Sequence, residues 1–105
     1  LLDAGVRVAL ATDYNPGTAP KADMAFTLLL AASQFKMSPA EILCASTLNG
    51  AAAMGLDSDR GALVPGYRAD ILLWQTPKAK NSQEILEHIL LGAGELAHVK
   101  TASSV

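Results

Sequence analysis

The sequence predicts an α/β fold built from two parts. In the segment Val6 to Ala11, most residues are apolar and compatible with a β-strand at both the odd and the even positions. This pattern is typical of a strand that is covered on both faces. Two stretches with helical periodicity follow it. After a polar connection, Asp57 to Gly61, the chain changes to short extended pieces around one more helix. We therefore expect residues 1–57 and 58–105 to be the two parts of the fold.

The composition excludes several classes of partner. The chain has 105 residues, half of them apolar, so it can form one small core. Eight basic and ten acidic residues give a net charge of -2 without a basic run, which predicts no nucleic-acid binding. No apolar stretch is long enough to span a bilayer, so we expect no membrane partner. The single cysteine, Cys44, cannot form an internal disulfide; we expect it to be buried in a helix of a cytoplasmic protein.

The amino-terminal residues indicate a piece of a longer polypeptide. Leu1 to Gly5 is typical of the last turn of a helix, which Gly5 would close before a strand begins. The chain has no initiating methionine and no charged segment followed by an apolar one, so a secretory signal is not expected here.

A carboxylate follows the first predicted strand directly. Asp13 would stand at the carboxyl end of that strand, where ligands collect in sheets and barrels, and a polar turn of Asn, Pro, Gly and Thr continues the chain. This pattern predicts a metal or substrate site. The alternative is structural, because Asp13 and Asn15 could simply form turns by bonding to their own backbone.

The next two segments are predicted helices. Lys21 to Phe35 is apolar nearly all the way round and would need cover on most sides. A capping box of Ser38 and Glu41, with proline at the first helical position, starts a second helix. We expect this helix to continue to Met54 and to end at Gly55.

The second part is predicted to contain a turn, two strands and a helix. Pro65-Gly66 is typical of a β-turn, and Ala69 to Trp74 follows it as a strand. A helix at about Ser82 to Leu91 and a strand at about Ala97 to Ala102 complete the chain.

Other residues whose side chains could bind a metal or line a ligand pocket are expected to have structural roles. His88 and His98 lack the close spacing of metal-ligand pairs, so we expect surface or packing roles for both. Tyr67 and Trp74 are expected to pack a small core rather than line a ligand pocket. Asp70 is expected to act in a turn or at a strand end.

Three blocks of sequence carry a resemblance to a known family: Ala9 to Thr18, Ser46 to Leu56 and Gly61 to Asp70. In this order they resemble the carboxyl-terminal part of the metal-dependent amidohydrolase superfamily. The last two blocks recur across that superfamily. The first, Asp-x-Asn-Pro-Gly-Thr, is narrower and is similar to members that open a cyclic amide during histidine degradation.

The resemblance implies a fragment of a (β/α)₈ barrel, consisting of the last strand, its loop and the following helices, together with part of a small composite β domain. It also implies that Asp13 lies at a divalent metal, Zn or Fe, and orients or deprotonates the attacking water. Asn15, Gly17 and Thr18 would contact a small polar substrate. The implied reaction is hydrolysis of a non-peptide C–N bond in a cyclic amide.

The same resemblance implies that essential parts lie outside this chain. The superfamily takes its histidine ligands from earlier barrel strands, including a His-x-His pair that is absent from this sequence. We therefore predict that the isolated chain binds no metal, is inactive, and self-associates because its strands lack partners. Two alternatives stay open: another cyclic amidohydrolase or aminohydrolase, and a non-catalytic oligomerisation module.

Overall fold

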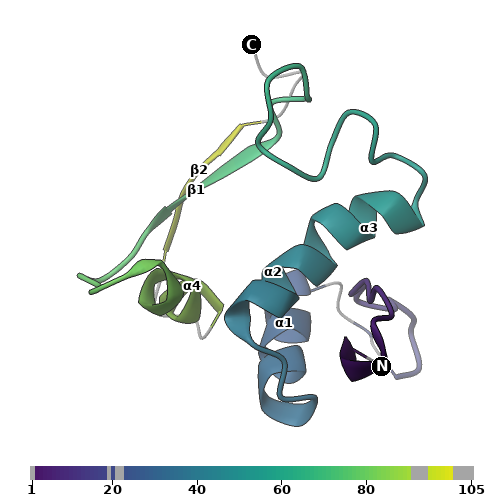
Figure 1. Ribbon diagram of the computed structural model, residues 1–105. Coiled ribbons are helices and arrows are strands. Elements are labelled where there is room, and N and C mark those ends of the chain that lie inside the picture. The colour runs from purple at the N-terminus through teal and green to yellow at the C-terminus, as the bar shows by residue number, and fades with distance from the viewer. Residues whose placement is uncertain (1, 19, 21–22, 91–94, 101–105) are drawn as a thin grey trace.

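The computed structural model describes residues 2–18, 20, 23–90 and 95–100, and in this part the chain is a small mixture of helices and strands (Figure 1). In chain order the elements are η1 (Leu2–Ala4), α1 (Met24–Gln34), α2 (Pro39–Ser46), α3 (Leu48–Ala53), β1 (Ile71–Gln75), α4 (Ser82–Leu90) and β2 (Glu95–Lys100). The short 3₁₀ turn η1 is followed by Gly5 at φ 76°, as predicted for a helical turn closed by glycine.

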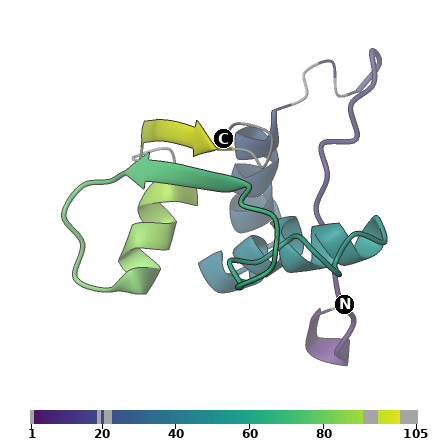
Figure 2. The same cartoon turned by 90° about the horizontal axis from the view of Figure 1, so that it is seen from above.

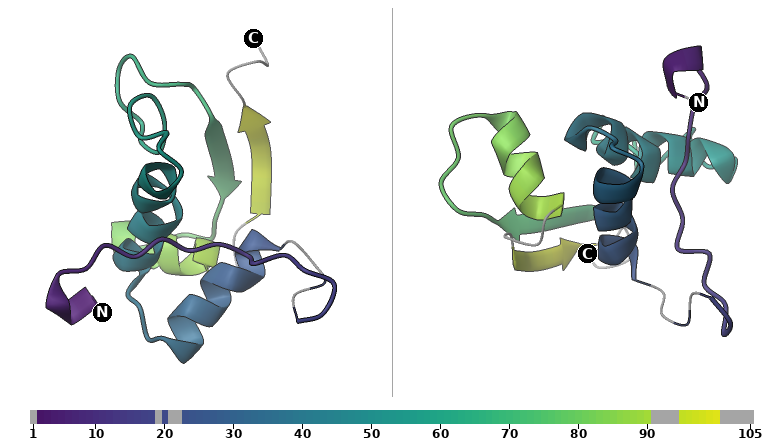
Figure 3. Two further views of the ribbon diagram at one scale, coloured as in Figure 1. Left: turned by 90° about the vertical axis from the view of Figure 1, so that its right-hand side faces the viewer. Right: turned by 90° about the horizontal axis from the view of Figure 1, so that it is seen from below.

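The first predicted strand is absent. Residues 6–11 are extended, but they form no hydrogen-bonded ladder with another segment. Figure 3 shows this segment as a coil that runs past the helices. A strand exists only where neighbours satisfy its backbone groups. The described part of the chain offers no strand beside this segment, so the prediction of a strand over Val6 to Ala11 is wrong for the isolated chain.

The helix α1 begins at a capping residue and buries little of its surface. The Asp23 carboxylate accepts a hydrogen bond from the Phe26 amide at 3.1 Å. Although α1 is apolar nearly all round, only Ala31 is buried in it, whereas Phe26 is 55% exposed. No helix in the described ranges is long and apolar enough to cross a membrane.

The start of α2 is as predicted. The Ser38 amide donates to the Glu41 carboxylate at 2.8 Å, and the Glu41 amide donates to the Ser38 hydroxyl at 3.3 Å. Two amides that have no partner inside the helix are thereby satisfied, with Pro39 in the first turn.

The long helix predicted from Pro39 to Met54 is broken into two. The break lies at Thr47, which leaves helical geometry at φ -119° and ψ -82°. The Thr47 hydroxyl donates back to the Leu43 carbonyl, and the Ser46 hydroxyl donates to the Ile42 carbonyl at 2.9 Å. Such back-bonding competes with the helical ladder and bends helices, which explains the interruption.

The end of α3 follows the prediction. Gly55 adopts φ 71°, its amide donates to the Ala52 carbonyl at 3.0 Å, and the Leu56 amide donates to the Ala51 carbonyl at 2.9 Å. This pair of bonds is a Schellman motif, in which a left-handed residue satisfies the last carbonyls of the helix.

The two strands of the second part pair with each other. β1 and β2 form an antiparallel sheet in which Leu72 lies opposite Val99 and Trp74 opposite Leu96, with a register shift after Leu73. Figure 2 shows that the chain passes from β1 through α4 to β2. The expectation that these strands lack partners is therefore wrong in part, but within the described residues each strand still has one unpaired edge. The Pro65-Gly66 turn is present, with Gly66 at φ 92°.

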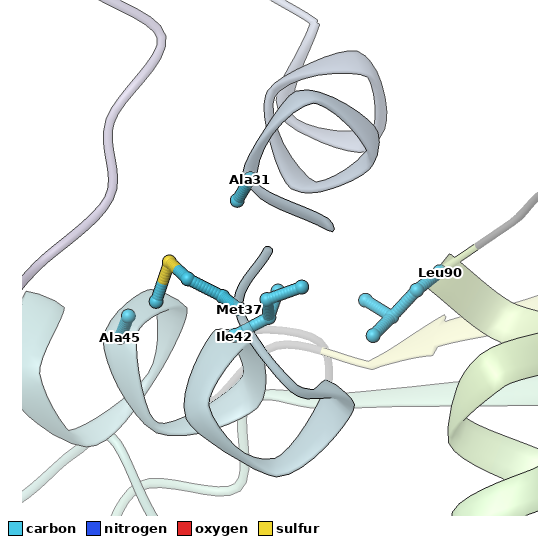
Figure 4. Packing of buried hydrophobic residues seen from close by; sticks show 5 residues of the cluster. All are labelled: Ala31, Met37, Ile42, Ala45 and Leu90. Atoms are coloured by element: carbon cyan, nitrogen blue, oxygen red, sulfur yellow. The ribbon is translucent and has the colours of Figure 1, made fainter. Parts of the chain in front are cut away.

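A small core joins the two parts of the chain. Its buried members come from α1, α2, α4 and the α1–α2 connection (Figure 4): Ala31, Met37, Ile42, Ala45 and Leu90. Through Leu90, α4 packs against the first 57 residues. The boundary near residue 57 stays a prediction.

Cys44 is exposed, contrary to the prediction. The buried side chains of α2 are Ile42 and Ala45, three residues apart and therefore on one face of the helix. Cys44 lies outside that face, on a part of α2 that the described residues leave exposed.

Candidate functional site

The loop after the first extended segment is organised by one side chain. The Asn15 amide oxygen accepts hydrogen bonds from the backbone amides of Gly17, at 3.0 Å, and Thr18, at 2.8 Å. The Asn15 amide nitrogen donates to the Asp13 carbonyl at 2.7 Å and lies 3.2 Å from the Thr18 hydroxyl. Asn15 therefore closes the loop on itself, as the structural alternative predicted.

The Asp13 carboxylate takes no part in this network, which reaches Asp13 only through its backbone carbonyl. Its backbone is left-handed, at φ 50°, a conformation that non-glycine residues adopt rarely and that Asp tolerates better than most. Its side chain is exposed, and the described part of the chain provides no hydrogen bond or ion pair to the carboxylate. Among the described residues, nothing therefore competes with a cation or a water molecule for this carboxylate.

The segment that leads to Asp13 is held by α2 and α3. The Leu10 amide donates to the Ala45 carbonyl at 3.1 Å, and the Asn49 side-chain amide donates to the Val8 carbonyl at 2.9 Å. A shallow groove of about 300 Å³ lies beside these bonds; its lining residues are Arg7, Ala9, Asn49, Ala52 and Ala53. No local pattern in the sequence points to Asn49, because only the fold brings it next to Val8.

A metal ion would find only one suitable ligand in the loop. Catalytic zinc is normally held by three protein ligands. Asp13 could supply one, but the ranges that the structure describes contain no group of three or more His, Cys, Asp or Glu residues that could hold a metal. The described residues therefore do not fit a complete metal centre by themselves.

The other candidate residues lie in structural settings. His88 is half-buried in α4, and its Nδ1 atom has no hydrogen-bond partner among the described residues. His98 belongs to β2, opposite Leu73; its side chain lies outside the described ones. The Tyr67 hydroxyl donates to the Asp57 carbonyl at 3.0 Å, and Trp74 is half-buried in β1.

Charged pairs surround the turn that precedes β1. The Arg60 side chain bonds to the Asp59 carboxylate at 2.8 Å, which lowers the pKa of Asp59 and raises the pKa of Arg60. Arg68 pairs with Asp70 at 3.0 Å. Asp70 directly precedes β1 and so lies at a strand end, as expected. Both ion pairs join residues one or two positions apart within the connection between α3 and β1.

Comparison with known proteins identifies relatives over most of the chain. Residues 1–102 match the amidohydrolase family. The chain is 51% identical over 77 residues to the imidazolonepropionase of Rubrobacter xylanophilus, which covers 73% of this chain and 19% of that protein. It is 50% identical over 74 residues to the imidazolonepropionase of Paracoccus denitrificans (70% of this chain, 18% of that protein). The corresponding enzyme of Chloroflexus aggregans is 48% identical over 73 residues, 70% of this chain and 17% of that protein.

The chain thus spans about a fifth of the length of the curated relatives that it matches. The family match extends over nearly all of its residues, including both of its predicted parts. The resemblance noted in the three sequence blocks is confirmed, and the chain belongs to the amidohydrolase family.

Proposed function

We propose that this chain is the carboxyl-terminal part of an imidazolonepropionase, which hydrolyses 4-imidazolone-5-propanoate to N-formimino-L-glutamate in histidine degradation. The observation that carries this proposal is the exposed Asp13 carboxylate, which has no hydrogen-bond or ion-pair partner among the described residues and lies beside a loop that Asn15 closes. The similarity to three imidazolonepropionases supports the choice of reaction. The single cysteine fits a cytoplasmic protein.

Asp13 is proposed to hold the attacking water and to accept its proton. An exposed carboxylate that no other described residue binds can do both, provided that the substrate carbonyl lies within reach. A divalent ion, Zn or Fe, would when bound make a water molecule more acidic. Asp13 would contribute one ligand to that ion, and the remaining ligands would come from residues outside this chain.

The loop residues are proposed to bind the substrate. Thr18 carries a hydroxyl that can bond to a carboxylate, and Gly17 lets the backbone approach closely. Asn15 already uses both its amide oxygen and its amide nitrogen within the loop. A contact between Asn15 and the substrate would therefore replace one of these bonds.

The extended segment Val6 to Ala11 is proposed to be the last strand of a (β/α)₈ barrel in the complete protein. Both its residue pattern and its position before Asp13 support this placement. The exposed apolar side chains of α1, such as Phe26 and Leu29, would then face other parts of the barrel.

The test is a substitution of Asp13 in the complete protein of which this chain is proposed to be a part. We expect Asp13→Asn to lower kcat for imidazolonepropionate by about a hundredfold or more, because the water loses its proton acceptor. Asp57→Asn, in the exposed connection after α3, is the matched control and should leave kcat unchanged. The isolated 105-residue chain should show no turnover.

Each alternative predicts a different result. Turnover of another cyclic amide or of an amino-substituted ring, but not of imidazolonepropionate, would indicate a related amidohydrolase or aminohydrolase. A complete protein in which Asp13→Asn has no effect on any such reaction would indicate a non-catalytic module. Metal-dependent turnover by the isolated chain would contradict the proposal that the other ligands lie outside it.

A further inference from the structure

The Asn15 side chain ties together residues on both sides of itself. Its amide nitrogen donates to the Asp13 carbonyl at 2.7 Å, two residues back. Its amide oxygen accepts from the backbone amides of Gly17, at 3.0 Å, and Thr18, at 2.8 Å, two and three residues ahead. Asparagine can make these bonds together because one planar group carries both donors and an acceptor. The path of the chain from residue 13 to residue 18 is therefore held by one side chain.

The residue at the start of this loop has an unusual backbone conformation. Asp13 adopts φ 50°, in the left-handed region that residues with a side chain rarely occupy. Such conformations persist only where the surrounding structure holds them. The bond from Asn15 fixes the peptide group that follows Asp13, and among the described residues no other hydrogen bond reaches the Asp13 backbone. The left-handed conformation of Asp13 therefore depends on Asn15.

The backbone conformation at Asp13 sets the direction of its carboxylate. Rotation about the N–Cα bond moves the Cβ atom, and with it the carboxylate, relative to the segment that precedes Asp13. A change from φ 50° to an ordinary value of about -60° would turn the Cα–Cβ bond by roughly 110°. Displacements as small as about 1 Å can reduce catalysis by about a hundredfold. Loss of the left-handed conformation would therefore take the carboxylate out of its working position.

The bonds of Asn15 do not depend on the rest of the fold. Each of them joins residues that are at most three positions apart. In a complete barrel, the neighbouring strands would set the position of residues 6–11 and of the Asp13 backbone at their end. The loop would still decide the direction in which the Asp13 carboxylate leaves that strand. We therefore expect the isolated chain and the complete protein to share this local arrangement.

We propose that Asn15 is a positioning residue for Asp13: its side-chain amide holds the left-handed backbone at Asp13 and thereby aims the carboxylate. This inference rests on the proposed function and gives Asn15 its role within it. The competing role, a direct contact with the substrate, would use amide groups that already hold the loop. The two roles differ in the kinetic constant that a substitution of Asn15 changes.

The experiment uses the complete protein and a double-mutant cycle. Asn15→Ala removes the whole side-chain amide. Asn15→Ser, which keeps one acceptor oxygen but has no amide nitrogen, is the second variant if the first does not fold. Asn81→Ala is the matched control, because Asn81 also closes a turn by accepting from an amide three residues ahead, that of Glu84 at 2.9 Å, but lies before α4. Each variant is combined with Asp13→Asn, and kcat and KM are measured where circular dichroism shows the proteins to be folded.

We expect Asn15→Ala to lower kcat about tenfold or more in the presence of Asp13, and by less than about twofold in the Asp13→Asn background, because both changes act on one step. KM should change by less than about threefold, since Asn15 makes no substrate contact in this scheme. Asn81→Ala should change neither constant by more than about twofold. In a crystal structure of the Asn15→Ala protein, Asp13 should have a negative φ.

Three results would overturn the inference while leaving the proposed function intact. The first is an Asp13 that stays left-handed in the crystal structure of the Asn15→Ala protein. The second is an unchanged kcat in this variant although Asp13→Asn is impaired. The third is an effect of Asn15→Ala, on KM or on kcat, that is equally large in both backgrounds, since this would indicate a direct substrate contact or a general loss of structure. If Asp13→Asn itself leaves kcat unchanged, the proposed function fails and the inference falls with it.

Discussion

At the scale of single residues, Gly61 illustrates how backbone conformation and packing act at one position. It adopts φ 98°, in the region that residues with a side chain rarely occupy. A Cβ atom there would lie 2.8 Å from the Ala51 Cβ and 3.1 Å from the Thr47 carbonyl oxygen. The turn before the second part can therefore pack against α3 only because this residue has no side chain.

Substitution of Gly61 should destabilise the fold for both reasons. We expect Gly61→Ala to lower the free energy of unfolding by about 2 kcal/mol or more, measured by urea unfolding with circular dichroism. Gly66→Ala is the matched control, because Gly66 has a similar φ of 92° but nothing within 4 Å of its added Cβ. Gly66→Ala should lower the free energy of unfolding only by the cost of the unfavourable backbone conformation, about 1 kcal/mol. Equal losses in the two variants would contradict the packing argument.

At the scale of elements, the helices α1, α2 and α4 begin at local polar signals that do not depend on the rest of the fold, whereas α3 begins without a side-chain cap. Asp23 accepts from the Phe26 amide before α1, Ser38 and Glu41 cap α2, and the Asn81 side chain accepts from the Glu84 amide at 2.9 Å before α4. Each of these contacts spans three residues, so it forms wherever the helix forms.

The contribution of such a cap can be measured at Ser38. We expect Ser38→Ala to lower the free energy of unfolding by about 1 kcal/mol, because the Glu41 amide loses its acceptor. The control is Ser33→Ala, which removes a hydroxyl that bonds back to the Leu29 carbonyl within α1. That change should be neutral or slightly stabilising, since Ala has the higher helix propensity. Thermal unfolding of both variants tests this, and a Ser38→Ala protein as stable as the parent would contradict it.

At the scale of the whole molecule, the chain exposes more surface than a compact protein of its size. Its accessible surface is 7663 Å², about 2,000 Å² more than the roughly 5,600 Å² expected for a folded monomer of this mass. Much of the exposed surface is apolar. Leu72 and Leu73 in β1 are 54% and 60% exposed, and Leu96 and Val99 in β2 are 47% and 49% exposed.

We therefore predict that the isolated chain self-associates. Unpaired strand edges and exposed apolar faces favour contact with another copy. Light scattering should give a mass above that of the 10.9 kDa monomer, rising with concentration. Leu72→Lys places a charge on the sheet and should reduce the association, whereas Lys78→Arg, in the connection after β1, should not. A monodisperse monomer at high concentration would contradict the prediction.

Features that depend on near neighbours could be predicted from the amino-acid sequence: the capping box at Ser38, the end of α3 at Gly55, the turn at Gly66 and the polar loop after Asp13. Family membership was also readable from three short blocks, and the comparison confirmed it.

Features that depend on distant partners became visible only in the folded chain. Residues 6–11 have the composition of a buried strand but form none, because a strand needs neighbours that this chain does not offer among its described residues. Cys44 is exposed because it lies outside the face of α2 that carries the buried Ile42 and Ala45. The bond from Asn49 to Val8 joins residues 41 positions apart, a contact that no local pattern encodes and that only the path of the folded backbone creates.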